Sequence, residues 1–80
     1  MSTIILYTGN NCKFCEQMKS ILTKRKIEFE ERNVDQNDTF FAELKVFFEG
    51  QKTYVPTFVV DGKIMTDRDF YRKFIGAKSQ

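Results

Sequence analysis

Cys12 and Cys15 are the residues of this sequence whose type and spacing are best suited to chemistry. They are the only two cysteines among 80 residues, and Lys13 and Phe14 separate them. A Cys-x-x-Cys pair can ligate a metal, form a static disulfide, or exchange electrons by making and breaking that disulfide. The neighbouring elements and the other available ligands distinguish these three roles.

The supply of further metal ligands is small. The chain has no histidine, whereas a structural zinc ion usually takes about four Cys or His ligands. Metal or iron–sulfur binding would need carboxylates or a second copy of the chain, and it stays open as the alternative from a different functional class. A purely structural disulfide would close so short a loop that it restricts the unfolded chain little. Redox exchange is the favoured interpretation.

The two cysteines follow a predicted strand and begin a predicted helix. Residues 4–7 form a short continuous apolar run, which is typical of a buried strand. Apolar side chains then recur at helical spacing and predict a helix over residues 13–25. Residues 27–30 alternate between apolar and acidic, which predicts a half-exposed second strand. These elements form a βαβ unit with parallel strands and a right-handed crossover.

The second half of the chain predicts a helix, a hairpin and a last helix. Apolar residues at helical spacing over 40–48 predict the first helix, with Asp38 as its N-cap and Gly50 beyond its end. Strands over 57–60 and 63–65 flank Asp61-Gly62, a pair that suits a type I′ turn.

Thr66 is expected to cap the last helix, with Asp69 at the capping-box position and Gly76 at its end. Its predicted inner side is made of Phe70, Tyr71, Phe74 and Ile75. The order β-α-β-α-β-β-α predicts one α/β domain over residues 1–80, with a mixed four-stranded sheet and helices on both faces.

The predicted helix start makes the two sulfur atoms unequal. Cys12 faces the unpaired N–H groups and the positive dipole end of the helix, and both favour a thiolate. We therefore expect the pKa of the Cys12 thiol to lie below the ~8.5 of a free cysteine. Cys15 lies one turn further on and should be less exposed. Cys12 is the expected nucleophile and Cys15 the expected resolving thiol.

Several motifs in this order resemble those of the glutaredoxin family, a branch of the thioredoxin-fold proteins, over about residues 4–74. The matching segments are Tyr7-Thr8, Cys12-Lys13-Phe14-Cys15, Asn33-Val34-Asp35, Tyr54-Val55-Pro56 and Thr66 to Phe70. The resemblance implies a thioredoxin-like fold of four strands flanked by three helices. It also implies a cis bond between Val55 and Pro56, beside the dithiol.

The resemblance further implies glutathione as a co-substrate, with no tightly bound cofactor and no metal. Glutathione would lie in a groove between the dithiol loop, the residue before the cis proline and the start of the last helix. The residues implied in this groove, besides Cys12, are Tyr7, Lys13, Phe14, Val55, Pro56, Asp67, Arg68 and Asp69.

Four places depart from the family pattern. Gly9 stands where the family often has lysine, and Lys13-Phe14 where it often has proline-tyrosine. Met65-Thr66 replaces a common glycine pair, and Arg68 stands where an acidic or small polar residue is common. The alternative is a glutaredoxin-like thioredoxin, reduced by thioredoxin reductase and donating electrons to ribonucleotide reductase.

Charge and hydropathy argue against nucleic acid and membranes as partners, which leaves the partners that the resemblance implies, glutathione and disulfide-containing proteins. The 13 basic and 11 acidic residues are interspersed, whereas a nucleic-acid-binding surface needs a basic stripe. No apolar run approaches the ~20 residues that span a membrane, and nothing at the start resembles a signal peptide. We expect a cytoplasmic monomer that binds neither nucleic acid nor membrane.

Overall fold

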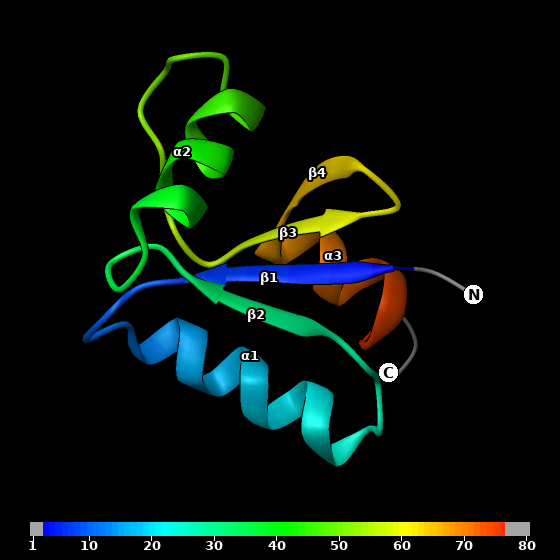
Figure 1. Ribbon diagram of the computed structural model, residues 1–80. Coiled ribbons are helices and arrows are strands. Elements are labelled where there is room, and N and C mark those ends of the chain that lie inside the picture. Colours follow the sequence, from blue (N-terminus) through cyan, green and yellow to red (C-terminus); the bar gives the residue numbers. More distant parts are fainter. Residues whose placement is uncertain (1–2, 77–80) are drawn as a thin grey trace.

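The structure, a computed structural model, describes residues 3–76 and contains one mixed sheet with helices on both faces (Figure 1). The elements are β1 (Ile4–Thr8), α1 (Lys13–Lys24), β2 (Glu30–Asn33), α2 (Asp38–Phe47), β3 (Thr57–Val60), β4 (Lys63–Thr66) and α3 (Asp67–Phe74). The strand order is β2-β1-β3-β4. β1 pairs parallel with β2 and antiparallel with β3, and β3 pairs antiparallel with β4. The predicted fold class is confirmed.

The central strand β1 places its side chains in two cores. Leu6 is fully buried and packs with residues of α1 and α3, including Leu22 and Phe70. Tyr7, the next residue, is 1% exposed and packs with Leu44 of α2 on the opposite face. A strand covered on both faces must be apolar at successive positions, which explains the continuous apolar run.

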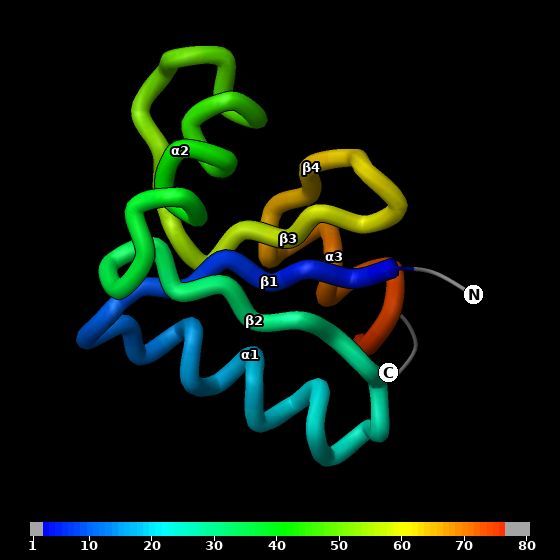
Figure 2. Tube along the Cα trace, viewed as in Figure 1, coloured from blue at the N-terminus to red at the C-terminus, as the bar shows by residue number. Residues whose placement is uncertain are grey.

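The two cores follow from the path of the chain. In the tube of Figure 2 the chain passes from β1 into α1 on one side of the sheet, and from β2 into α2 on the other. The loops after these two parallel strands therefore diverge at the same edge of the sheet. Among residues 3–76, no helix has the length and apolar character needed to cross a bilayer.

Stacked aromatic rings join α3 to the sheet. The rings of Phe58 and Phe70 lie 3.8 Å apart between centroids and are nearly parallel, at 4°. Phe70 also stacks on Phe74 at 4.6 Å. The placement of Tyr71 on the inner side was wrong, since Tyr71 is 43% exposed. It follows Phe70 directly, so helical geometry turns it about 100° away from the sheet.

The predicted second strand was shifted along the chain. Residues 27–30 were expected in it, but β2 comprises Glu30–Asn33, beginning where Glu30 pairs with Ile5. Ile27 and Phe29 precede β2 and are half-buried against the core of α1 and α3. Their alternation reflects packing of an extended connection, whereas β2 itself is a polar edge strand.

The caps of two helices differ in how well they were predicted. Asp38 was wrongly expected to cap α2, because the Oδ1 atom of Asn37 accepts the N–H groups of Thr39 and Phe40 instead. Asparagine and aspartate are about equally good N-caps, so sequence preference does not separate these neighbours. Thr66 caps α3 as expected, since its Oγ1 accepts the N–H of Asp69 at 3.0 Å.

The hairpin between β3 and β4 has the predicted turn. Asp61 and Gly62 have φ values of 51° and 85°, the two positive values that a type I′ turn requires. The N–H of Asp61 donates to the carbonyl of Thr3, so the turn is also tied to the start of the chain.

A polar contact ties β1, β2 and α1 together. The Oε2 atom of Glu31 accepts hydrogen bonds from Thr8 Oγ1 at 2.8 Å and from Lys19 Nζ at 3.0 Å. Burial alone would raise the pKa of the Glu31 carboxyl, but these two hydrogen bonds outweigh it and lower the pKa. The ionised carboxylate therefore stabilises the end of β1 from which the dithiol loop begins.

Replacing Phe70 by alanine should remove the link between α3 and the sheet. Because Phe70 is fully buried, the cavity should cost about 3–5 kcal/mol of unfolding free energy. The matched control is Phe14→Ala, since Phe14 is 66% exposed and its removal should cost less than about 0.5 kcal/mol. Urea denaturation of both variants measures the difference. Equal effects would contradict this packing.

Replacing Glu31 by glutamine should weaken the acid dependence of stability. A carboxyl with a lowered folded-state pKa stabilises the fold above its ordinary pKa, and this contribution is lost as the pH falls through the folded-state value. The unfolding free energy of Glu31→Gln should therefore fall less than that of the parent chain between neutral and acid pH. Glu28→Gln, at an exposed glutamate outside β2, is the control. An unchanged pH profile in Glu31→Gln would argue against the contact.

Candidate active site

The sulfur of Cys12 forms the N-cap of α1. Cys12 has an extended backbone, with φ −109° and ψ 103°, and its Sγ accepts the N–H of Cys15 at 3.1 Å. The two cysteines are joined by a disulfide, with their Cα atoms 5.2 Å apart. The predicted placement of the pair at the start of the helix is confirmed. One sulfur atom thus both caps the helix and bonds to its partner cysteine.

The two cysteines differ in exposure. Cys12 is half-buried, whereas Cys15 has 0% of its surface exposed. The hollow beside the pair has a volume of about 390 Å³ and is lined by Asn11, Cys12, Lys13 and Glu16. A substrate sulfur can therefore approach Cys12 from this hollow, while Cys15 can act on the bond that Cys12 forms.

The loop that leads to Cys12 is packed closely against two side chains. A Cβ atom on Gly9 would lie 2.9 Å from Asp35 Oδ2 and 3.3 Å from Val55 Cγ2. Asp35 Oδ2 also accepts the N–H of Asn10 at 2.7 Å. The loop runs between these two side chains, and any residue larger than glycine at position 9 would force one of them to move. This contact gives a physical reason for Gly9.

The bond between Val55 and Pro56 is cis, as the resemblance implies. Pro56 is buried and directly precedes β3, while Val55 is half-buried. The contact between Gly9 and the Val55 side chain places this segment beside the dithiol loop. Thr57 Oγ1 donates to the carbonyl of Tyr54 at 2.7 Å and holds the turn.

The other residues implied in the groove have different surroundings. Lys13 and Phe14 are exposed on the first turn of α1, beside Cys12. At the start of α3, Asp67 is half-buried, and Arg68 and Asp69 are exposed. Asp67 and Arg68 share with Met18 of α1 a hollow of about 470 Å³. This hollow joins the start of α3 to α1, one turn beyond Cys15.

Tyr7 is not brought together with the dithiol surface. It is 1% exposed and belongs to the core beneath α2. Its hydroxyl donates to Glu43 at 2.9 Å and accepts from Arg32 at 3.5 Å. Burial, followed by the hydrogen bond to Glu43, raises the pKa of this hydroxyl. Tyr7 therefore joins β1 to α2 in this structure.

Asp35 and Asn10 were missed as residues that position the site. Both lie in turn-rich segments, where asparagine and aspartate usually serve the local backbone. Their contact spans 25 positions of the chain and depends on the parallel pairing of β1 with β2. Within residues 3–76, no group of three or more His, Cys, Asp or Glu side chains is arranged to hold a metal ion.

Comparison with known proteins agrees with this architecture. The crystal structure of the thioredoxin-like protein BC3987, mutant T8A, is similar at a TM-score of 0.77 and 20% identity. The match covers 92% of this chain and 100% of that one. A second crystal structure of BC3987 gives a TM-score of 0.68 at 22% identity, covering 89% and 94% of the two chains. These similarities support a thioredoxin-like fold.

No curated protein sequence matches the chain. The sequence profile of the family described as Glutaredoxin, however, matches residues 4–65, which is most of the chain. That range contains the Cys12–Cys15 pair, the loop beside Asp35 and the Val55–Pro56 bond. The chain belongs to the glutaredoxin family.

Proposed function

We propose that the chain is a small dithiol–disulfide oxidoreductase that reduces protein disulfides and glutathione mixed disulfides through Cys12 and Cys15. The observation that carries this proposal is the unequal pair at the start of α1. A half-buried cysteine caps the helix and is bonded to a fully buried one. That asymmetry suits a nucleophile and a resolving thiol.

The proposed reaction has two exchange steps. The Cys12 thiolate attacks one sulfur of the substrate disulfide and forms a mixed disulfide with it. This attack breaks the substrate disulfide bond and releases the first substrate thiolate, and the released thiolate then takes up a proton. Cys15, deprotonated, then attacks the Cys12 sulfur of the mixed disulfide and releases the second substrate thiolate, which is likewise protonated. The substrate gains two electrons, and the protein is left with the Cys12–Cys15 disulfide.

The surroundings of Cys12 favour its thiolate. The N–H of Cys15 points at the Cys12 sulfur, and the positive end of the α1 dipole adds to its effect. Lys13 contributes positive charge beside it, while Glu16, on the same hollow, opposes it. We infer that Cys12 is the more acidic of the two thiols in the reduced protein.

Replacing each cysteine by serine should separate the two roles. Cys12→Ser should lower disulfide-reductase activity by about a thousandfold or more, because the nucleophile is lost. Cys15→Ser should still attack a mixed disulfide but remain trapped as a covalent adduct on Cys12, which mass spectrometry of the intact protein detects. Full reductase activity in Cys12→Ser would contradict the proposal. The zinc content and visible absorbance of the purified parent protein test the metal-binding alternative.

Glutathione is the proposed reductant of the oxidised protein. The candidate contacts are the exposed Lys13 and Phe14, the Val55–Pro56 segment and the polar start of α3, whose N–H groups suit a carboxylate. One observation favours thioredoxin reductase as the second candidate. Gly9 offers no cation to a glutathione carboxylate, and the Asp35 carboxylate lies directly beside that position.

The reductant can be identified by following NADPH consumption. Oxidised protein is offered either glutathione with glutathione reductase, or thioredoxin reductase without glutathione. If glutathione is the reductant, only the first mixture should consume NADPH faster than a blank without the protein. Fast consumption in the second mixture alone would replace glutathione by thioredoxin reductase, while leaving the roles of Cys12 and Cys15 unchanged.

A further inference from the structure

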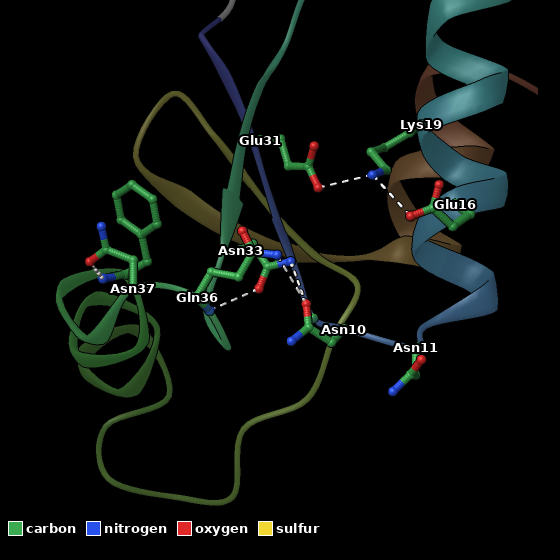
Figure 3. A pocket seen from close by; sticks show the side chains of 10 residues that line it. Asn10, Asn11, Glu16, Lys19, Glu31, Asn33, Gln36 and Asn37 are labelled. Atoms are coloured by element: carbon green, nitrogen blue, oxygen red, sulfur yellow. Dashed lines mark hydrogen bonds and ion pairs between the residues drawn. The ribbon is translucent and has the colours of Figure 1, made fainter.

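A polar hollow lies at the carboxyl ends of β1 and β2, and we call it the β1–β2 crevice (Figure 3). Its volume is about 570 Å³. Five amide side chains line it, from the loop after β1 and from the end of β2 through the following turn. They are Asn10, Asn11, Asn33, Gln36 and Asn37. Residues of α1 complete its wall.

The crevice occupies the place where open α/β sheets bind ligands. In such sheets the ligand site is the gap outside the carboxyl ends of neighbouring parallel strands whose connections leave in opposite directions. Here β1 leads to α1 on one face, and β2 leads to α2 on the other (Figure 2). The topology itself therefore opens the gap.

The crevice adjoins the dithiol. Asn11 and Glu16 line both the β1–β2 crevice and the smaller hollow beside Cys12. The crevice reaches Lys19 on α1, seven residues beyond Cys12 and about 10 Å along the helix axis. An extended peptide covers that distance in about three residues. A segment bound at Cys12 can thus place a nearby side chain in the crevice.

Three amide side chains of the crevice are bonded to one another and still offer hydrogen bonds. Asn10 Oδ1 accepts from Asn33 Nδ2 at 3.2 Å and from Gln36 Nε2 at 3.3 Å (Figure 3). Within the described chain, these contacts leave Asn10 Nδ2 and Gln36 Oε1 for a ligand. One donor and one acceptor at fixed positions suit a polar chain such as a polypeptide.

The charges of the crevice favour a cation. Lys19 lies between Glu16 and Glu31, with its Nζ 3.0 Å from the Oε2 atom of each. Two carboxylates and one ammonium leave a net charge of −1. In residues 3–76 the Oε1 atoms of both glutamates remain as acceptors. A lysine or arginine side chain of a ligand could donate to them.

We propose that the β1–β2 crevice is a subsite for the polypeptide of a disulfide substrate, and that it receives a lysine or arginine about three residues from the substrate cysteine. This inference rests on the proposed function. The inference deepens that function by naming the substrate class, a protein disulfide flanked by basic residues. It also assigns specificity to Glu16, Glu31 and Gln36, which lie outside the groove implied for glutathione.

The test uses three disulfides and the pre-reduced protein in single turnovers. One peptide has its cysteine bonded to 2-mercaptoethanol, with lysine three residues away on each side. The second peptide has glutamate at those places, and the third compound is uncharged bis(2-hydroxyethyl) disulfide. Each turnover converts the Cys12–Cys15 dithiol to the disulfide and releases two thiols. Acid quenching and chromatography give the second-order rate constants.

Three variants isolate the crevice. Gln36→Lys and Gln36→Glu both remove the amide that donates to Asn10 but differ in charge. Gln51→Lys is the matched control, because Gln51 is also exposed but lines neither the crevice nor the hollow beside Cys12. It makes the same change in net charge as Gln36→Lys.

We expect the parent chain to reduce the lysine peptide about fivefold faster than the glutamate peptide. Gln36→Lys should lower the rate on the lysine peptide about fivefold relative to Gln36→Glu. All chains should reduce the uncharged disulfide equally, and Gln51→Lys should behave as the parent.

Two results would overturn the subsite alone: equal rates on the two peptides, or the same effect from Gln51→Lys as from Gln36→Lys. In both cases reduction of the uncharged disulfide leaves the proposed function standing. A parent chain that reduces none of the three compounds would instead overturn the proposed function, and the subsite with it.

Discussion

The hydrogen bond from the Cys15 N–H to the Cys12 sulfur is the contact on which the proposed chemistry of this protein depends. It starts α1 at Cys12, so the cap of the helix and the proposed nucleophile are one atom. Because the second cysteine lies one turn into the same helix, it is buried while the first stays accessible. Local helix geometry thus accounts for the unequal exposure of the two cysteines and for the order of the two proposed exchange steps.

The position of this helix start depends on the end of β1 and the loop that follows it, so both must be fixed. Two long-range contacts do this from the same edge of the sheet: Asp35 accepts the N–H of Asn10, and Glu31 joins Thr8 to Lys19. Both depend on the parallel pairing of β1 with β2, which brings the ends of the two strands together. The same pairing, with α1 and α2 leaving to opposite faces, opens the crevice beside the dithiol. The contacts that support the dithiol loop and the crevice beside it therefore share one structural origin.

Local signals predicted most of the fold. The continuous apolar run of β1, the helical spacing of α1 and the Asp61-Gly62 turn each depend on neighbouring residues, and each was confirmed. The second strand was placed about three residues too early, because packing of Ile27 and Phe29 against the core imitates strand alternation. Tyr71 was placed inward, although only tertiary packing decides which residues of a short helix face the sheet.

The sequence by itself determined the dithiol, its place at a helix start and the inequality of its two sulfurs, because all three follow from residues close together in the chain. Only the tertiary structure decided the surroundings. It placed Tyr7 in the core beneath α2 and Gly9 close to both Asp35 and Val55. It also brought five amide side chains together around a crevice. These contacts join residues far apart in the sequence. Strand pairing and helix packing bring them together, and no local pattern encodes which of them will meet.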